Sequence, residues 1–216
     1  MPQETWFNLP DDKRRRVFDV IVDEFIAHGY AEASLNRIAT RAQVSKGSLF
    51  QYFDNKLDMW QLATSVSAER VWSACAAAVG PPETPFPERL TALVLAWMRH
   101  LRDNAVDRSL AAATIDTADP EARRFIRENT NQAYADHIGR LVADACDRGE
   151  VAPAEADRLA TVIILLMRFL ANAPFSADRD PILDLHTRPW PEIESAANDL
   201  VASTVRSFLI DPVDAG

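Results

Sequence analysis

Residues 44 to 53, VSKGSLFQYF, combine a cation, hydroxyls, an amide and three aromatic rings without a single acid. Gln51 can donate to and accept from adenine at once, and Ser48 can bond a base edge or a phosphate. Lys46 can reach a guanine edge or a phosphate, and Tyr52 can give its hydroxyl to a phosphate. A glycine at position 47 would let the backbone approach a duplex closely. These residue types suit DNA recognition.

A helical wheel at 100° per residue indicates which of these side chains share a face. We expect one side to pack against neighbouring helices and the other to face DNA; the first holds Leu49, Phe50 and Phe53, and the second Gly47, Ser48, Gln51 and Tyr52. The alternative is that this polar face is only solvated surface, as most such faces on short helices are.

The elements around this stretch are predicted from apolar spacing and capping residues. Apolar residues spaced as one helix face predict a helix over residues 11–28, which Gly29 ends. Ser34 and Ser45 are predicted N-caps of two further short helices. Two short helices separated by so few residues form a helix-turn-helix unit.

The remaining sequence is also helical in pattern, so the predicted fold class is all-α with about nine helices. Further helices are expected at 56–79, 88–103, 106–117, 120–148, 154–173 and 190–209. We expect an N-terminal three-helix DNA-binding domain over residues 1–55 and a larger helical domain for ligand binding and dimerisation over residues 56–216.

Charge and composition narrow the function classes. The formal net charge is −9, but residues 34–56 carry a local net charge of +3, which suits a nucleic-acid surface on an acidic protein. The four histidines have no ligand spacing and no nucleophile motif or phosphate loop is present, so neither an enzyme, a metal site nor a cofactor is expected. The polar N-terminus and the short apolar run at 162–167 indicate a cytoplasmic protein without a membrane span.

Residues 29–59, GYAEASLNRIATRAQVSKGSLFQYFDNKLDM, resemble the DNA-binding domain of the TetR family of bacterial transcriptional regulators, and the preceding helix extends the resemblance to about the first 60 residues. The resemblance implies phosphate contacts from Ser34, Ser45, Tyr52 and Lys56. It places Lys46, Gly47, Ser48 and Gln51 on the recognition helix, and Arg37 where some members reach a base or phosphate.

Three positions depart from the family pattern. Ser34 stands where threonine is common, which preserves the cap. Gln43 stands where glycine is common, so a left-handed conformation there would cost energy. Phe50 stands where tyrosine is common, so a hydroxyl contact to phosphate is missing.

The resemblance also implies a homodimer, a double-stranded DNA operator and an unidentified small-molecule effector. The dimer is expected through the last two long helices, at about 155–173 and 190–209, and the alternative is that the first of them is a core helix of its own chain. Arg168, a permanent charge in an apolar helix, is expected to be buried and to meet either an acid or an anionic ligand. The candidate pocket residues are Trp72, Trp97, Met98, Leu101, Phe125, Asn129, Tyr134, His137, Leu141 and Arg168, and the alternative role of the apolar ones is core packing.

The function expected is therefore that of a dimeric repressor that binds a palindromic operator and is released by a small molecule. The alternative is a helical protein-interaction module whose basic N-terminal domain has no specific DNA target.

Overall fold

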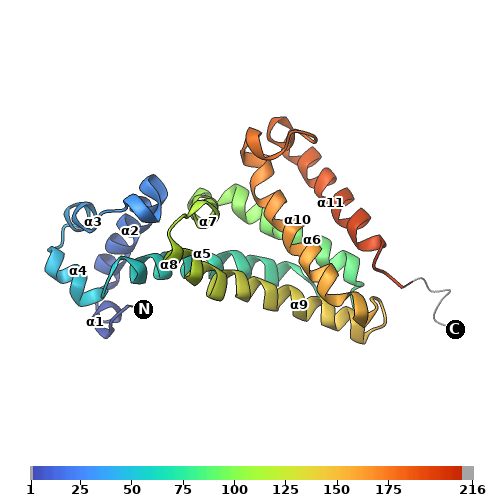
Figure 1. The fold of residues 1–216 in the computed structure, drawn as a ribbon, viewed down its shortest axis with the longest axis horizontal. Coiled ribbons are helices and arrows are strands. Elements are labelled where there is room, and N and C mark those ends of the chain that lie inside the picture. Colours follow the sequence, from blue (N-terminus) through green and yellow to red (C-terminus); the bar gives the residue numbers. More distant parts are fainter. Residues whose placement is uncertain (1, 211–216) are drawn as a thin grey trace. The chain divides into compact units, whose positions relative to one another are not determined.

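The computed structural model describes residues 2–210 (Figure 1). These residues form eleven α-helices and no β-strand, apart from one isolated β-bridge between Val151 and Leu209. The all-α prediction is confirmed. The structure has two more α-helices than the nine expected. One is α1, Glu4–Phe7; the other arises because a π-helical stretch, Ile126–Asn131, separates α8, Pro120–Phe125, from α9, Gln132–Asp147.

The chain divides into two compact units. The first unit runs up to Arg70 and includes Asn104–Asn131, and the second unit holds Val71–Asp103 and the residues from Gln132 onward. The division falls inside α5, Lys56–Ala78, whose residues contribute to both units. The expected functional boundary between residues 55 and 56 remains a prediction.

Three helices of the first unit follow the expected pattern closely. They are α2, Asp11–Glu32, α3, Leu35–Arg41, and α4, Lys46–Tyr52. Gly29 has φ 64° and ψ 176°, so the regular helix of α2 breaks there, as its position in the sequence predicts. Because the break redirects the chain, α3 can return across α2.

The first unit has its own apolar core. The rings of Phe25 and Trp60 meet edge to face at a centroid distance of 5.0 Å, an arrangement that aromatic pairs favour. The helix α7, Ala105–Asp116, joins the unit by packing on α2, and its buried Asp107 accepts hydrogen bonds from Arg70 of α5. The fully buried apolar side chains of this core include Val17, Ile21, Ile38, Leu49, Phe53 and Met59.

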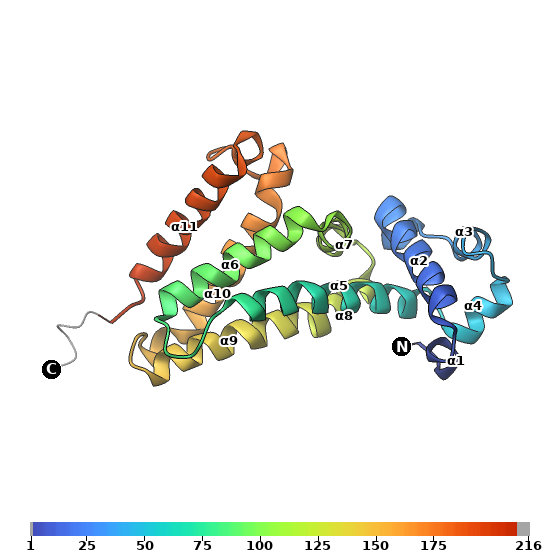
Figure 2. The ribbon, with the colours of Figure 1, turned by 180° about the vertical axis from the view of Figure 1, so that it is seen from behind.

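In the second unit, α9 and three further helices pack together. These three are α6 (Phe86–Asp103), α10 (Ala156–Asn172) and α11 (Trp190–Arg206). In Figures 1 and 2 the C-terminal part of α5 lies beside α9, and there the Trp72 ring stacks on His137 at 3.8 Å. The core of this unit includes Leu90, Leu93, Val94, Ile163, Leu170 and Val201.

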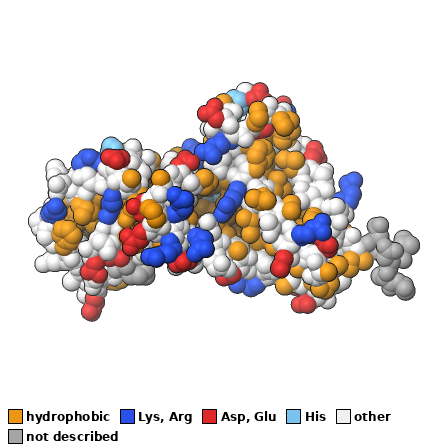
Figure 3. Space-filling model, in the orientation of Figure 1, with side chains coloured by type: hydrophobic (Ala, Val, Ile, Leu, Met, Phe, Trp, Pro, Cys, Tyr) orange, Lys and Arg blue, Asp and Glu red, His pale blue; other side chains and the backbone are white. Residues whose placement is uncertain are grey.

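The helix α10 leaves apolar surface uncovered. The segment Pro153–Phe175 has a mean hydropathy of 1.5 over an 18-residue window that is 33% buried, so its length and composition alone match a membrane span. Core helices of soluble proteins pass the same test. Leu165 is 59% exposed, and Figure 3 shows hydrophobic side chains gathering where α10 lies.

Arg168 is not buried within the chain, and its expected burial against an acid of the dimer partner or a ligand stays a prediction. Arg168 is exposed on the same helix face as Leu165, three residues earlier, and forms no ion pair with a described residue. The helix buries Ile163, Met167 and Leu170 instead, so its opposite side carries Leu165 and Arg168 outward.

Candidate nucleic-acid interface

The turn between α3 and α4 is built from hydrogen bonds that the sequence specifies. The amide of Val44 donates to the Ala39 carbonyl at 3.0 Å, and that of Gln43 donates to the Thr40 carbonyl at 3.2 Å. This is the Schellman pattern, which requires a left-handed residue after the helix cap. Gln43 supplies it with φ 55°, in place of the glycine that tolerates such a φ without cost.

Both predicted serine caps are confirmed. The Ser34 Oγ accepts a hydrogen bond from the Arg37 amide at 3.4 Å, and the Ser45 Oγ accepts one from the Ser48 amide at 2.9 Å. The Ser45 and Ser48 hydroxyls also lie 2.8 Å apart in a hydrogen bond. The caps fix where α3 and α4 begin, so they set which α4 side chains face outward.

The exposed face of α4 consists of Lys46, Gly47, Phe50 and Gln51. The expected burial of Phe50 is wrong, since this side chain is 46% exposed. The expected outward position of Tyr52 is also wrong, since it is only 5% exposed. The face therefore presents a cation, a glycine, a phenyl ring and an amide together.

Two features explain the corrections at Phe50 and Tyr52. Phe53 follows the seven-residue α4 in an extended conformation with φ −142°, so a helical wheel does not place it. The unpredicted helix α1 covers the end of α4: its Trp6 ring lies 6.2 Å from Tyr52 and 4.9 Å from Phe53. The Gln3 amide also donates to the Tyr52 carbonyl at 2.9 Å. Trp6, five residues ahead of the start of α2, is the sequence signal for this cover.

Most cations of the basic window are engaged within the first unit. Lys56 donates to the Ala31 carbonyl at 2.9 Å and lies 4.7 Å from the Tyr30 ring centroid. Arg41 pairs with Asp23 at 2.8 Å. Lys46, by contrast, is exposed and forms no hydrogen bond or ion pair with any described residue. The local charge of +3 therefore overstates the cations that lie open to a polyanion.

Arg37 is exposed, as expected, but it is bound to a buried acid. Its Nε atom donates to Oε1 of Glu24 at 2.7 Å, and its Nη2 atom forms an ion pair with the same oxygen at 2.6 Å. Burial opposes the charge of this carboxyl, but the hydrogen bonds from Arg37 and the Ser34 amide hold the pKa of Glu24 below its ordinary value. The sequence pattern gave no indication of this pair, because an acid at an otherwise apolar position carries no mark of its partner.

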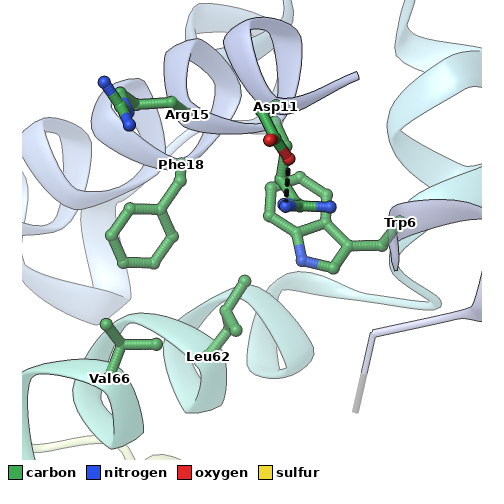
Figure 4. Close-up of a pocket in the computed structure, with 7 residues that line it drawn as sticks. Trp6, Asp11, Arg15, Phe18, Leu62 and Val66 are labelled. Carbon is green, nitrogen blue, oxygen red and sulfur yellow. Dashed lines mark hydrogen bonds and ion pairs between the residues drawn. The ribbon is translucent and has the colours of Figure 1, made fainter. Parts of the chain in front are cut away.

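A cavity of about 390 Å³ lies on the first unit between α1, α2 and α5 (Figure 4). Phe18, Leu62 and Val66 form an apolar wall, and Arg14 on the rim pairs with Asp11 at 2.5 Å. Arg15 is the cation there without a partner among the described residues. The sequence did not predict this cavity, because its lining comes from separate helices.

The predicted pocket residues fall in both units. Phe125 and Asn129 belong to the first unit, and the Asn129 amide donates to the Phe125 carbonyl at 3.0 Å. The other eight belong to the second unit: Trp72, Trp97, Met98, Leu101, Tyr134, His137, Leu141 and Arg168. Of these, Met98, Leu101 and Leu141 are buried core residues.

An aromatic group within the second unit unites four of the predicted residues. The Trp97 and Tyr134 rings lie 4.8 Å apart, and Trp72 contacts both Tyr134 and His137. The Trp97 Nε1 atom is buried and has no hydrogen-bond partner among the described residues. Burial, reinforced by Arg140, lowers the pKa of His137, so the imidazole is neutral at pH 7. These groups offer aromatic contact and polar contacts without a fixed charge.

Residues 17–61 match the family of bacterial regulatory proteins described as the tetR family. Among curated proteins, the chain is 33% identical over 51 residues to the HTH-type transcriptional regulator SrpR of Pseudomonas putida, a match over 24% of each chain. It is 35% identical over 51 residues to the HTH-type transcriptional repressor SCO4008 of Streptomyces coelicolor, over 24% of this chain and 27% of that protein. These two matches thus span about a quarter of each relative's length.

A longer match reaches the HTH-type transcriptional activator FasR of Mycolicibacterium smegmatis, with 25% identity over 178 residues, 82% of this chain and 80% of that one. Among solved structures, a TetR family regulator from Chloroflexus aurantiacus has a TM-score of 0.69 at 24% identity, covering 98% of this chain and 100% of its own. The regulator FadR from Bacillus subtilis, solved with stearoyl-CoA, has a TM-score of 0.65 at 15% identity, covering 88% and 98%. The structural matches show a shared fold.

Proposed function

Because this chain belongs to the tetR family of bacterial regulatory proteins, we propose that it is a transcriptional repressor that binds a palindromic DNA operator as a dimer and leaves it when a small molecule binds. The observation that carries the proposal is the α3–α4 pair. A Schellman turn and two serine caps hold α4 so that Lys46, Gly47 and Gln51 share an exposed face. A short helix held in this way has the geometry of a recognition helix in the major groove.

Each exposed α4 residue has a proposed role at the base edges. Gln51 pairs with adenine, and Lys46 with a guanine or a phosphate. Gly47 admits the duplex close to the backbone. Phe50, exposed in the middle of this polar face, has one apolar partner to meet in the major groove, the methyl group of thymine.

The set proposed for the phosphate contacts differs from the one that the sequence suggested. Ser34, Ser45 and Ser48 keep hydroxyl oxygens at the N-terminal ends of α3 and α4, while Arg37 carries a charge on α3 and Lys56 one at the start of α5. We leave Tyr52 out, because its ring is buried between Trp6 and Lys13, whose Nζ lies 5.8 Å from the ring centroid.

The dimer is proposed through α10 and α11. Leu165 is 59% exposed on α10, and Leu200 of α11 is only half-buried, so both helices have apolar surface to cover. Burying such surface is the usual driving force for association. One recognition helix reads too few base pairs to find a single genomic site, so two DNA-binding domains, one from each chain of the dimer and called heads below, are needed.

The effector is proposed to bind the second unit near the Trp72–His137 stack. The aromatic rings and the unpaired Trp97 Nε1 favour an uncharged or weakly acidic molecule with a flat apolar portion and a hydrogen-bond acceptor. FadR binds a different kind of molecule, stearoyl-CoA, so the ligand class is not transferred from it. FasR is an activator. The exposed α4 face supports DNA binding both for a repressor and for an activator of transcription.

Selection of bound duplexes from a random DNA pool tests the proposal. We expect one enriched sequence with two-fold symmetry and half-sites about one helical turn apart, bound with steep salt dependence. The rival function, a protein-interaction module, predicts no enriched sequence and a protein partner retained on the basic surface. Equal binding to random and selected duplexes at moderate salt would rule out the repressor.

A further inference from the structure

Glu24 is an acid at a position where the helix α2 turns its apolar side inward. Its side chain is fully buried, and its Oε1 atom accepts two hydrogen bonds and forms a close ion pair. The donors are the Ser34 amide at 2.8 Å and the Nε atom of Arg37 at 2.7 Å, and the Arg37 Nη2 atom forms an ion pair with the same oxygen at 2.6 Å. One carboxylate oxygen thus ties the start of α3 to the Arg37 side chain.

The second oxygen of Glu24 lies among further basic groups. Its Oε2 atom accepts no hydrogen bond from a described residue, but it is 3.9 Å from the His28 Nε2 and 4.0 Å from the Arg41 Nη1. Taking a carboxylate fully out of water is expensive even when it is paired. A pair needed only to join α2 to α3 would cost less on the surface, as the exposed Arg41–Asp23 pair does.

The geometry of Arg37 indicates what this burial achieves. The Nε atom of Arg37 donates to the Glu24 carboxylate, and Nη2 forms an ion pair with that carboxylate while donating its hydrogen bond to the Glu32 carbonyl at 2.7 Å. Among the described residues, no hydrogen bond of Arg37 uses Nη1, although nearly half of the side chain is exposed. A guanidinium held on one edge keeps its other edge in a fixed direction, because its nitrogens form a rigid planar fork.

We infer that Glu24 is a positioning residue for DNA binding, which fixes the Arg37 guanidinium so that its Nη1 meets a backbone phosphate beside the recognition helix. The inference rests on the proposed function and adds a residue to it. Without Glu24, Arg37 would have to be ordered when DNA binds, at a cost of roughly 0.5–1.5 kcal/mol per side chain, or about two- to tenfold in affinity per head.

Two simpler explanations give different results for the same variant. If Glu24 only neutralises charge near the DNA, Glu24→Gln removes one negative charge from each head, which raises its net charge by one, and binding becomes tighter and more dependent on salt. If Glu24 only joins α2 to α3, the variant is less stable but the folded protein binds DNA as before. Positioning predicts weaker binding in spite of the added charge.

The test uses the full chain and a duplex that the unaltered protein enriches from a random pool. Glu24→Gln preserves the shape of the side chain, and Asp23→Asn is the matched control, because it removes an acid from the adjacent exposed pair with Arg41. We expect Glu24→Gln to bind about two- to tenfold more weakly per head, and Asp23→Asn to bind equally or more tightly. In the Glu24→Gln background, Arg37→Ala should cost much less than it does alone.

A second variant keeps the inference testable if Glu24→Gln does not fold. Arg37→Lys retains the charge but not the planar fork, so we expect weaker binding and a salt dependence reduced by about one ion per head. Unaltered affinity and salt slope in both variants overturn the inference, as does tighter binding by Glu24→Gln. If the unaltered protein enriches no duplex at all, the proposed function fails instead, and the two failures are distinct.

Discussion

At the scale of single residues, the exposed face of α4 carries the sequence-specific part of the proposal. It places the phenyl ring of Phe50 between the amide of Gln51 and the cation of Lys46. The ring removes the hydroxyl that a tyrosine would offer to a phosphate. The ring instead offers an apolar surface that can distinguish thymine, which carries a methyl group in the major groove, from the other bases.

The role proposed for Phe50 can be tested by removing one methyl group from the DNA. Replacing each thymine of the selected site by uracil in turn, we expect one position per half-site to weaken binding about three- to fivefold, the value of one buried methyl group. Phe50→Ala should bind the thymine and uracil duplexes equally, while Phe50→Tyr should still distinguish them. Titration of labelled duplexes measures this, and equal binding of every uracil duplex by the unaltered protein would contradict it.

Gly47 gives the second test at this scale. Its φ is not left-handed, and an added Cβ would meet only the Ser45 Oγ, at 3.7 Å. The fold therefore has no need of glycine there, and Gly47→Ala should raise the free energy of unfolding by up to about 1 kcal/mol. If DNA approaches the backbone at this point, affinity for the operator should fall on the order of tenfold, as with one mismatched base pair. Loss of stability together with affinity would contradict this explanation.

At the scale of elements, the sequence predicts helices through local signals that the structure retains. Gly29 breaks α2, and Ser34 and Ser45 cap α3 and α4, because each of these effects depends on a few neighbouring backbone groups. The orientation of Tyr52 depends instead on α1, a separate element whose Trp6 is distant in sequence. The Glu24–Arg37 pair is non-local in the same way, so helical periodicity cannot reveal it.

The α3–α4 turn gives a prediction for an element. Gln43 adopts φ 55° in a Schellman turn that favours glycine, so it stores strain of about 1 kcal/mol. Gln43→Gly should therefore stabilise the chain by about that amount in urea-induced unfolding followed by circular dichroism. Gln43→Ala, which retains the left-handed strain, is the control and should give no stabilisation. If both variants behave alike, strain is not what Gln43 contributes.

At the scale of the whole molecule, the sequence indicated the two roles of the chain but not how its residues divide between compact units. The all-α class and the apolar α10 follow from composition and periodicity. The inclusion of α7 and α8 in the first unit does not, because it depends on contacts such as that of Arg70 with Asp107, 37 residues apart in sequence. Periodicity also does not show that Arg168 is exposed within the chain, because an apolar helix with one side left for a partner has the same pattern as a buried one.

The dimer is the prediction on which the function of the whole molecule depends. Leu165→Glu places a charge on the exposed side of α10, where it would be buried between partners at a cost that association cannot offset. We expect a monomer in sedimentation velocity and a loss of operator affinity of at least about a hundredfold, because the two heads no longer share one effective concentration. Binding to random DNA should change little, since that depends on each head alone.

Ile182→Glu is the matched control for the dimer. Ile182 is 87% exposed and lies outside α10 and α11, so a charge there should leave both the dimer and operator binding intact. If Leu165→Glu remains a dimer that binds the operator normally, the partner lies on another surface. If Ile182→Glu alone gives a monomer, that surface includes the segment between α10 and α11. Either result would mean that the exposed face of α10, with Leu165 and Arg168, is not the dimer interface.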